Sequence, residues 1–246
     1  MTLPYDPADP FDSLQVLDAG FGPFLTRVYA TLAGGLALSA AVAWSVATLE
    51  PLRRLFFVVT SGGGYGFTLL GLLLAFSPLA VMMFFGFRRQ TPSASGAGAL
   101  YWTIAALFGG SMAVLALTYT GTALTSTFLV TAGGFAGLSA LGLMTRRNLS
   151  GLGAFLTMAL FGLILALVVS LFLNSPLVTL ALNLAGVLIF AGLTAADSQQ
   201  LRRIYAEAGD PETRGIAAVN GALSLYLNFL NLFQFLLAFS GPRGRR

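Results

Sequence analysis

Long uninterrupted apolar runs dominate the chain from about residue 25 onward, and short polar or charged stretches separate them. A helix needs roughly 20 apolar residues to cross a hydrocarbon core of about 30 Å. The runs are continuous, so they lack the alternation that is typical of transmembrane strands. We therefore predict an all-α integral membrane protein with seven transmembrane helices, near 25–48, 66–87, 99–119, 124–144, 153–173, 177–198 and 216–239.

The seventh apolar segment differs from the others because polar side chains recur along it. Their spacing of four, four, three and three residues places them within an arc of about 120° on one helix face. Such a face is unfavourable against lipid, so we expect this helix to be central or to line a wet cavity. The side chains are candidates for an ion path and belong to Asn220, Ser224, Asn228, Asn231 and Gln234.

Composition agrees with the membrane assignment and excludes several kinds of chemistry. Of the 246 residues, 57% are hydrophobic and 9% are charged, whereas soluble domains carry about 25% charged residues. The mean hydropathy is +0.84. The chain has no Cys and no His, which removes thiols and imidazoles as nucleophiles, bases or metal ligands. We therefore expect a protein that is not an enzyme and holds no cofactor.

The cationic side chains are all Arg, and most stand in pairs at the ends of apolar runs. This placement is typical of membrane topology, so the pI near 9.9 does not indicate nucleic-acid binding. The side of the N-terminus collects Arg27, Arg88, Arg89, Arg146, Arg147, Arg202, Arg203 and Arg214, and the other side has Arg53, Arg54, Arg243, Arg245 and Arg246. The positive-inside rule then predicts a cytoplasmic N-terminus. A re-entrant seventh segment would move the last three Arg to the cytoplasmic side, and that alternative stays open.

The chain divides into one large unit with short ends. Its first 20 residues contain four Asp and three Pro and lack the basic start of a signal peptide. We predict a flexible acidic N-terminal tail over 1–22, a seven-helix transmembrane domain over 23–240 and a short basic tail over 241–246. Small residues, as in Gly133-x-x-x-Gly137, predict close packing between helices.

Asp197 is a carboxylate at a point where the sixth apolar segment has not clearly ended, in "NLAGVLIFAGLTAADSQQLRRIY". One interpretation is an interfacial residue, solvated at the end of the helix, which the following Gln and Arg residues favour. The other is that the helix continues and Asp197 faces the bundle interior, on one face with Asn183, Thr194 and Ser198. An ionisable group inside a span indicates function. The residues alone favour neither interpretation over the other.

Two C-terminal motifs, "GLTAADSQQLRRIY" and "GALSLYLNFLNLFQFLL", resemble the paired sixth- and seventh-helix signatures of the Bax inhibitor-1 family. "RVYATLAGGLALSAAVAW" (27–44) is similar to the start of the first helix in the bacterial branch of that family, and "FGFRRQ" (85–90) closes the second span. The resemblance implies a fold of six helices around a central seventh. Family members are described as pH-sensitive calcium leak channels and, in bacteria, as partners of a membrane-bound AAA protease.

The resemblance also implies a candidate site on the cytoplasmic side. The family's pH sensor is a pair of aspartates on the last two helices, and an Arg at the end of the second helix can bond to the first of them. Asp197 matches the first aspartate and Arg88 matches the Arg, but Asn228 stands where many relatives have the second aspartate. The implied latch therefore consists of Asp197, Arg88 and Asn228, with one carboxylate instead of two.

Two functions remain as hypotheses. The first is a pH-modulated cation leak with Asp197 as a cytoplasmic-side latch and calcium as the expected ion, because calcium prefers carboxylate and carbonyl oxygens. The alternative is a non-conducting membrane interaction protein that modulates a membrane protease or a stress response. Both hypotheses place the chain in the lipid bilayer of a bacterial inner membrane. The expected partners are calcium, bound at Asp197, and a membrane-bound AAA protease, with no nucleic acid.

Overall fold

Eight helices and one short hairpin make up the described part of the chain. The computed structural model describes residues 10–60, 64–86, 93–173 and 175–241. The helices are α1 (Pro10–Thr48), α2 (Glu50–Phe56), α3 (Leu69–Gly86), α4 (Ala94–Thr118), α5 (Gly121–Met144), α6 (Ser150–Leu173), α7 (Pro176–Glu207) and α8 (Pro211–Ala238). The strands β1 (Phe57–Val59) and β2 (Tyr65–Phe67) pair antiparallel, with Phe57 opposite Phe67.

The predicted class, an all-α integral membrane protein, is confirmed. Among the described residues, six helices are long and apolar enough to cross a membrane, namely α1 from Gly20 onward, α4, α5, α6, α7 and α8. The predicted span near 66–87 corresponds to α3, which is a shorter apolar helix. Helix α2 and the β1–β2 hairpin lie between α1 and α3, and the sequence pattern did not predict them.

Two helix boundaries differ from the sequence prediction. Helix α1 begins at Pro10, so residues 10–22, which we assigned to a tail, are helical, and Pro23 lies inside the helix. Helix α7 runs to Glu207, nine residues beyond the predicted end at 198. The residues that follow Asp197 include Gln, Leu and Arg, which favour helix. The apolar run therefore ends before the helix does.

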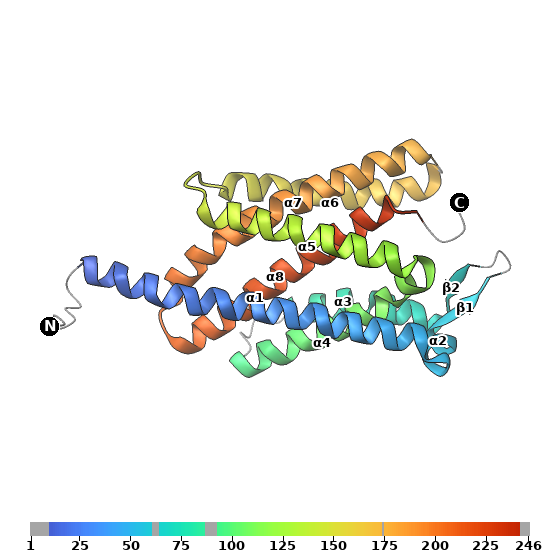
Figure 1. Cartoon of the computed structure of the whole chain (residues 1–246), viewed down its shortest axis with the longest axis horizontal. Coiled ribbons are helices and arrows are strands. Elements are labelled where there is room, and N and C mark those ends of the chain that lie inside the picture. Colours follow the sequence, from blue (N-terminus) through green and yellow to red (C-terminus); the bar gives the residue numbers. More distant parts are fainter. Residues whose placement is uncertain (1–9, 61–63, 87–92, 174, 242–246) are drawn as a thin grey trace.

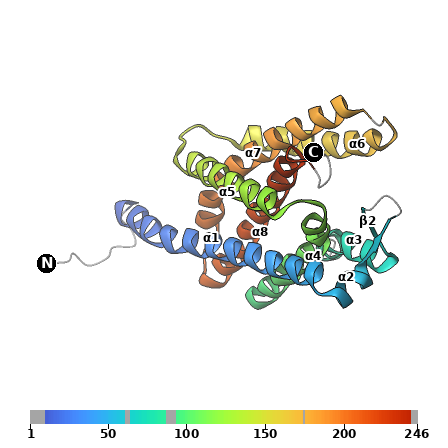
Figure 2. The same cartoon turned by 45° about the vertical axis from the view of Figure 1, so that its right-hand side comes forward.

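Helix α8 lies between two groups of helices. Figure 1 shows α5, α6 and α7 on one side of it and α1, α3 and α4 on the other, and the turned view in Figure 2 agrees. Helix α8 packs on α1, α4, α5 and α7. In its most apolar stretch 61% of the residues are buried, against 11–33% in the other five candidate spans. Among these six helices, α8 is therefore the most enclosed.

A buried hydrogen-bond network ties α8 to the pair α1 and α4. The hydroxyl of Tyr226 lies 2.7 Å from Ser39 Oγ, and Ser39 Oγ donates toward the carbonyl oxygens of Gly35 and Ala105, each at 2.8 Å. A serine hydroxyl has one hydrogen and a carbonyl can only accept, which leaves Tyr226 as the donor to Ser39. Buried hydroxyls need such partners, so this network fixes the position of α8 on α1.

Two glycines permit close helix crossings. A β carbon on Gly142 of α5 would collide with the carbonyl oxygen of Ala195 on α7, and one on Gly109 of α4 would lie 2.6 Å from the carbonyl oxygen of Ser39 on α1. The close packing predicted at Gly133 and Gly137 is wrong within the described chain, because β carbons there would meet nothing within 4 Å. The spacing of two glycines indicates a helix face without bulky side chains, but it does not show whether another helix packs on that face.

Candidate functional site

Asp197 lies well inside α7 rather than at its end. Helix α7 continues for ten residues beyond it, almost three turns at about 3.6 residues per turn. The residue is half-buried, and the interpretation that it sits at a helix end is wrong. The carboxylate is therefore carried by a continuous helix that packs on α5, α6 and α8.

The carboxylate of Asp197 is bound by two side chains of α8. Ser224 Oγ donates to Asp197 Oδ2 at 2.5 Å, and Asn228 Nδ2 donates to the same oxygen at 2.8 Å. Ser224 and Asn228 are four residues apart, which places them on the same face of α8. Asn228 is only 5% exposed. Hydrogen bonds to an ionised acceptor are stronger than neutral ones, so these two bonds join α7 to α8.

The other polar residues of the predicted α8 stripe do not join this contact. Asn231 Nδ2 donates to the carbonyl oxygen of Leu227 in its own helix at 2.8 Å. Asn220 and Gln234 are exposed. The spacing correctly predicted that these polar side chains share one face of α8, but neighbouring helices cover only part of that face. Arg88 lies outside the described residues, so its contact with Asp197 stays a prediction.

Two hydroxyls next to Asp197 on α7 have other partners. Ser198 Oγ donates to Ser139 Oγ on α5 at 3.0 Å, and Thr194 Oγ1 donates to the carbonyl oxygen of Phe190 at 2.7 Å. Both side chains are fully buried. Among these three side chains, the polar contact with α8 therefore belongs to Asp197, while Ser198, about 100° further around the helix, bonds α7 to α5.

A cavity of about 580 Å³ opens beside Asp197, between the end of α5, the start of α6 and the last turns of α7. Asp197, Arg202 and Arg203 line it from α7, and Thr145 and Asn148 line it from the loop between α5 and α6. It therefore brings one carboxylate and two guanidinium groups to one polar space, which we call the inner cavity.

Gln199 holds the loop that closes one side of the inner cavity. Its Nε2 donates to the carbonyl oxygen of Arg147 at 2.8 Å and, more weakly, to that of Thr145 at 3.4 Å. Its Oε1 accepts from Leu149 N at 2.7 Å. No local sequence pattern predicts this role, because the contact joins residues fifty positions apart.

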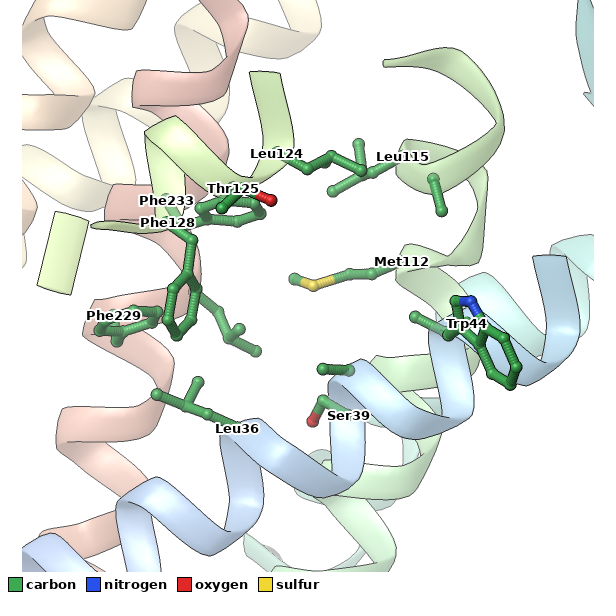
Figure 3. Close-up of a pocket in the computed structure, with 14 residues that line it drawn as sticks. Leu36, Ser39, Trp44, Met112, Leu115, Leu124, Thr125, Phe128, Phe229 and Phe233 are labelled. Atoms are coloured by element: carbon green, nitrogen blue, oxygen red, sulfur yellow. The ribbon is translucent and has the colours of Figure 1, made fainter. Parts of the chain in front are cut away.

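A second cavity, of about 490 Å³, is almost wholly apolar. Helices α1, α4, α5 and α8 line it, and we call it the outer crevice (Figure 3). It shares no lining residue with the inner cavity. In particular, Phe229, Leu230 and Phe233 of α8 face this crevice, whereas Asp197 faces the inner cavity.

The end of the bundle near the inner cavity gathers cationic and aromatic side chains. Phe21 and Phe24 of α1 pack on Tyr205 near the end of α7, with ring centroids 5.5 and 5.1 Å from it. The guanidinium of Arg202 lies 5.6 Å from the Phe21 ring, and that of Arg214 lies 4.9 Å from the Tyr205 ring. Aromatic faces attract such cations. The start of α1 is therefore tied to the connection between α7 and α8.

Asp210 organises the short connection between α7 and α8. Its Oδ1 accepts from the backbone N–H groups of Glu212 and Thr213, each at 3.0 Å, and its Oδ2 accepts from Thr213 Oγ1 at 2.5 Å. This is an N-cap, and Pro211 follows at the first helical position. The hydrogen bond from the Thr213 side chain, together with the backbone bonds, lowers the pKa of Asp210 below its ordinary value.

The donor set around Asp197 is too small for a resident calcium ion. Calcium takes six to eight oxygen ligands, several of them carboxylates in tight sites. The described residues contain no group of three acidic, His or Cys side chains that could hold a metal ion. Asn228 also presents its N–H group, not its oxygen, to Asp197.

Known proteins resemble this chain over nearly its whole length. A family model described as "Inhibitor of apoptosis-promoting Bax1" matches residues 23–245. A protein of Caulobacter vibrioides is 47% identical over 241 residues, which cover 98% of this chain and 94% of that protein. The inner membrane protein YbhL of Escherichia coli is 36% identical over 234 residues, which cover 94% of this chain and 97% of YbhL.

These matches cover the spans, the connection between α7 and α8 and the residues around Asp197. They agree with the resemblance carried by the two C-terminal motifs. The chain is a membrane protein with several transmembrane helices, and it belongs to the Bax inhibitor-1 family.

Proposed function

We propose that the chain is a cation leak protein of the bacterial inner membrane, closed by the contact between α7 and α8. The observation that carries the proposal is the Asp197 carboxylate, which lies on a candidate span and is bound by Ser224 and Asn228 of α8. Ionisable residues inside spans are rare and often mark ion pathways. Calcium is the expected ion, as transported substrate rather than as a cofactor.

The proposed closed state is supported by the separation of the two cavities, which share no lining residue. Asp197 lines the inner cavity, and Phe229 and Leu230 line the outer crevice. Asn228, which binds Asp197, directly precedes these two residues. In this proposal a cation that moves from one cavity to the other passes the contact between Asp197 and α8. Breaking the bonds from Ser224 and Asn228 would free α8 to move, so Asp197 acts as a latch.

The proposal assigns seven membrane crossings to the chain. Helix α3 has 18 residues and is about 27 Å long at about 1.5 Å per residue, close to the thickness of a hydrocarbon core. With α3 counted, α8 packs on four of the other six crossing helices, namely α1, α4, α5 and α7. The backbone of Arg147 accepts from Gln199 of α7, and Arg202 and Arg214 stack on aromatic rings at the same end of the bundle. The positive-inside rule then puts this end and the N-terminus in the cytoplasm.

The charges near Asp197 make the proposed leak slow. Arg202 and Arg203 line the same inner cavity as Asp197 and would repel an approaching divalent cation. One carboxylate supplies at most two of the six to eight oxygens that calcium prefers. A calcium ion would therefore keep much of its water and bind weakly, which permits passage but not rapid capture.

Calcium entry into liposomes tests this function. The purified protein is inserted into liposomes that contain a calcium-sensitive dye, and protein-free liposomes give the background. We expect the natural protein to admit calcium slowly and the Asp197→Ala variant to admit it several times faster. Asn231→Ala is the matched control, because among the described residues Asn231 bonds to its own helix and lines neither cavity, and it should behave as the natural protein.

The same experiment separates the leak from its alternative. If neither the natural protein nor Asp197→Ala admits calcium above the background, the leak proposal is wrong. The chain would then be taken as a non-conducting interaction protein that modulates a membrane protease or a stress response. In that case Asp197 would hold α7 against α8 for stability alone.

A further inference from the structure

The outer crevice separates two helices that follow each other in the chain. Helices α4 and α5 are joined by only Tyr119 and Thr120, yet they hardly pack on one another among the described residues. Figure 3 shows the space between them, with Met112 of α4 and Phe128 of α5 on opposite sides and Leu36 of α1 below. The crevice is therefore a gap between the two helix groups, with α8 at its base.

Exposure changes from the mouth of the crevice to its base. At the mouth, Trp44 of α1 is 67% exposed and Phe128 of α5 is 42% exposed. At the base, Phe229 and Leu230 of α8 are 3% and 5% exposed. The mouth lies on the outer surface of helices that are apolar enough to span a membrane. The crevice is therefore open to the lipid side.

Water is a poor occupant of this space. The one buried polar side chain at the base is Ser39, whose hydroxyl is already bonded to Tyr226 and to backbone carbonyl oxygens. A water molecule needs two to four polar partners, and apolar cavities stay dry. If the crevice were empty, its lining side chains would lose van der Waals contacts on one side, which is unfavourable. On the lipid side, the abundant apolar groups are the acyl chains of the membrane lipids.

We propose that the outer crevice binds one acyl chain of a membrane phospholipid. A water molecule takes about 30 Å³ in the liquid, and a methylene group is of similar size, so the 490 Å³ crevice holds on the order of 16 methylene groups. That is about the length of one fatty-acid chain. The proposal does not depend on a cation leak, because the lining residues and the lipid-facing mouth carry it alone.

The bound acyl chain would touch α8 next to the Asp197 contact. Phe229, at the base of the crevice, follows directly after Asn228. Its ring also packs edge-on against Phe128 at 5.5 Å and against Phe135 at 5.4 Å. A chain in the crevice would complete the cover of this aromatic cluster and hold α8 against α5.

The two Trp residues of the chain provide the test. In the Trp102→Phe variant, Trp44 at the crevice mouth is the single Trp, which can be excited selectively over the seven Tyr residues. This variant in maltoside detergent is titrated with phosphatidylglycerol that carries bromine atoms midway along one acyl chain, since bromine quenches Trp fluorescence. We expect quenching that saturates near one lipid per protein. In the Trp44→Phe variant only Trp102 reports, and its quenching should rise steadily with the lipid fraction of the micelles.

A crevice-filling substitution completes the test. Ala43 lines the crevice on α1, so Ala43→Phe should abolish the saturating quenching. Ala33→Phe is the matched control on the same helix, at an exposed position outside the crevice, and it should leave the saturation unchanged. The proposal is overturned if Trp44 quenching rises as steadily as that of Trp102, or if Ala43→Phe, with an unchanged melting curve, still shows saturation at one lipid per protein.

Discussion

Asn228 of α8 donates from Nδ2 to Asp197 Oδ2 of α7 at 2.8 Å, across 31 positions of the chain. Ser224 donates to the same oxygen one turn earlier on α8. Both hydrogen bonds between the two helices therefore end on the same atom, Asp197 Oδ2. A change at any of the three side chains tests that link, and each has a different expected result.

Removing the carboxylate should loosen the helix pair. In Asp197→Ala the Asn228 amide group, which is buried, and the Ser224 hydroxyl lose their acceptor. An unsatisfied buried group costs about 1–3 kcal/mol. We expect a clearly lower melting temperature in detergent. Asp197→Asn keeps an acceptor oxygen without the charge, so its loss should be smaller. Equal melting curves for the natural protein and Asp197→Ala would exclude a structural latch.

A second carboxylate should create a response to pH. Two carboxylates at hydrogen-bond distance do not both ionise readily, and the pair titrates as a unit. Asn228→Asp would build such a pair with Asp197. Calcium flux through the natural protein should change little between about pH 6 and 8, whereas flux through Asn228→Asp should change steeply there.

Asn231→Asp controls for the added charge. It introduces a carboxylate three residues further along α8, at a side chain that bonds to Leu227 rather than to Asp197. Its flux should keep the shallow pH profile of the natural protein. The flux of the natural protein could change steeply with pH, or the two variants could show the same dependence of flux on pH. Either result would show that positions 197 and 228 do not form the pH sensor that the family resemblance implies.

The crossing of α5 and α7 should be sensitive to a single methyl group. In Gly142→Ala the new β carbon collides with the carbonyl oxygen of Ala195, which belongs to backbone and cannot turn away. We expect a markedly lower melting temperature. Gly137→Ala on the same helix meets open space and should be neutral or slightly stabilising, by up to about 1 kcal/mol of helix propensity. Equal effects at the two positions would contradict the crossing.

The connection between α7 and α8 should weaken in acid. The pKa of Asp210 is lowered in the folded protein, so its capping contribution is fully present above the ordinary pKa of an aspartate. That contribution is lost as the pH falls through the lowered folded-state pKa. Melting temperatures measured from neutral pH into acid should fall less steeply for Asp210→Asn than for the natural protein. Parallel curves would show that the cap does not contribute.

The sequence predicted those features that depend on local pattern. Run length located α1 and α4 to α8, because a span must match the thickness of the bilayer. Helical spacing put Ser224 and Asn228 on one face, and the family resemblance paired Asn228 with Asp197. The structure brings these three side chains together.

Features that depend on tertiary packing were not predictable in this way. The end of α7 was predicted too early, because the residues after the apolar run still favour helix and the helix continues to Glu207. Gln199 was missed, since its partners lie on a loop fifty positions away. Asn220 and Gln234 share the spacing of Asn228 but are exposed, because the spacing does not say which helix covers which part of a face.

A reversible covalent lock between α7 and α8 tests the latch most directly. The chain has no Cys, so the double variant Asp197→Cys with Ser224→Cys contains only two thiols. The two side chains that they replace are in hydrogen-bond contact, so both thiols lie where α7 meets α8. In calcium-loaded dye liposomes we predict slow entry while the disulfide is intact, and entry several times faster after reduction, reversed by reoxidation. Equal rates in the oxidised and reduced states, with the disulfide verified by thiol titration, would contradict the account.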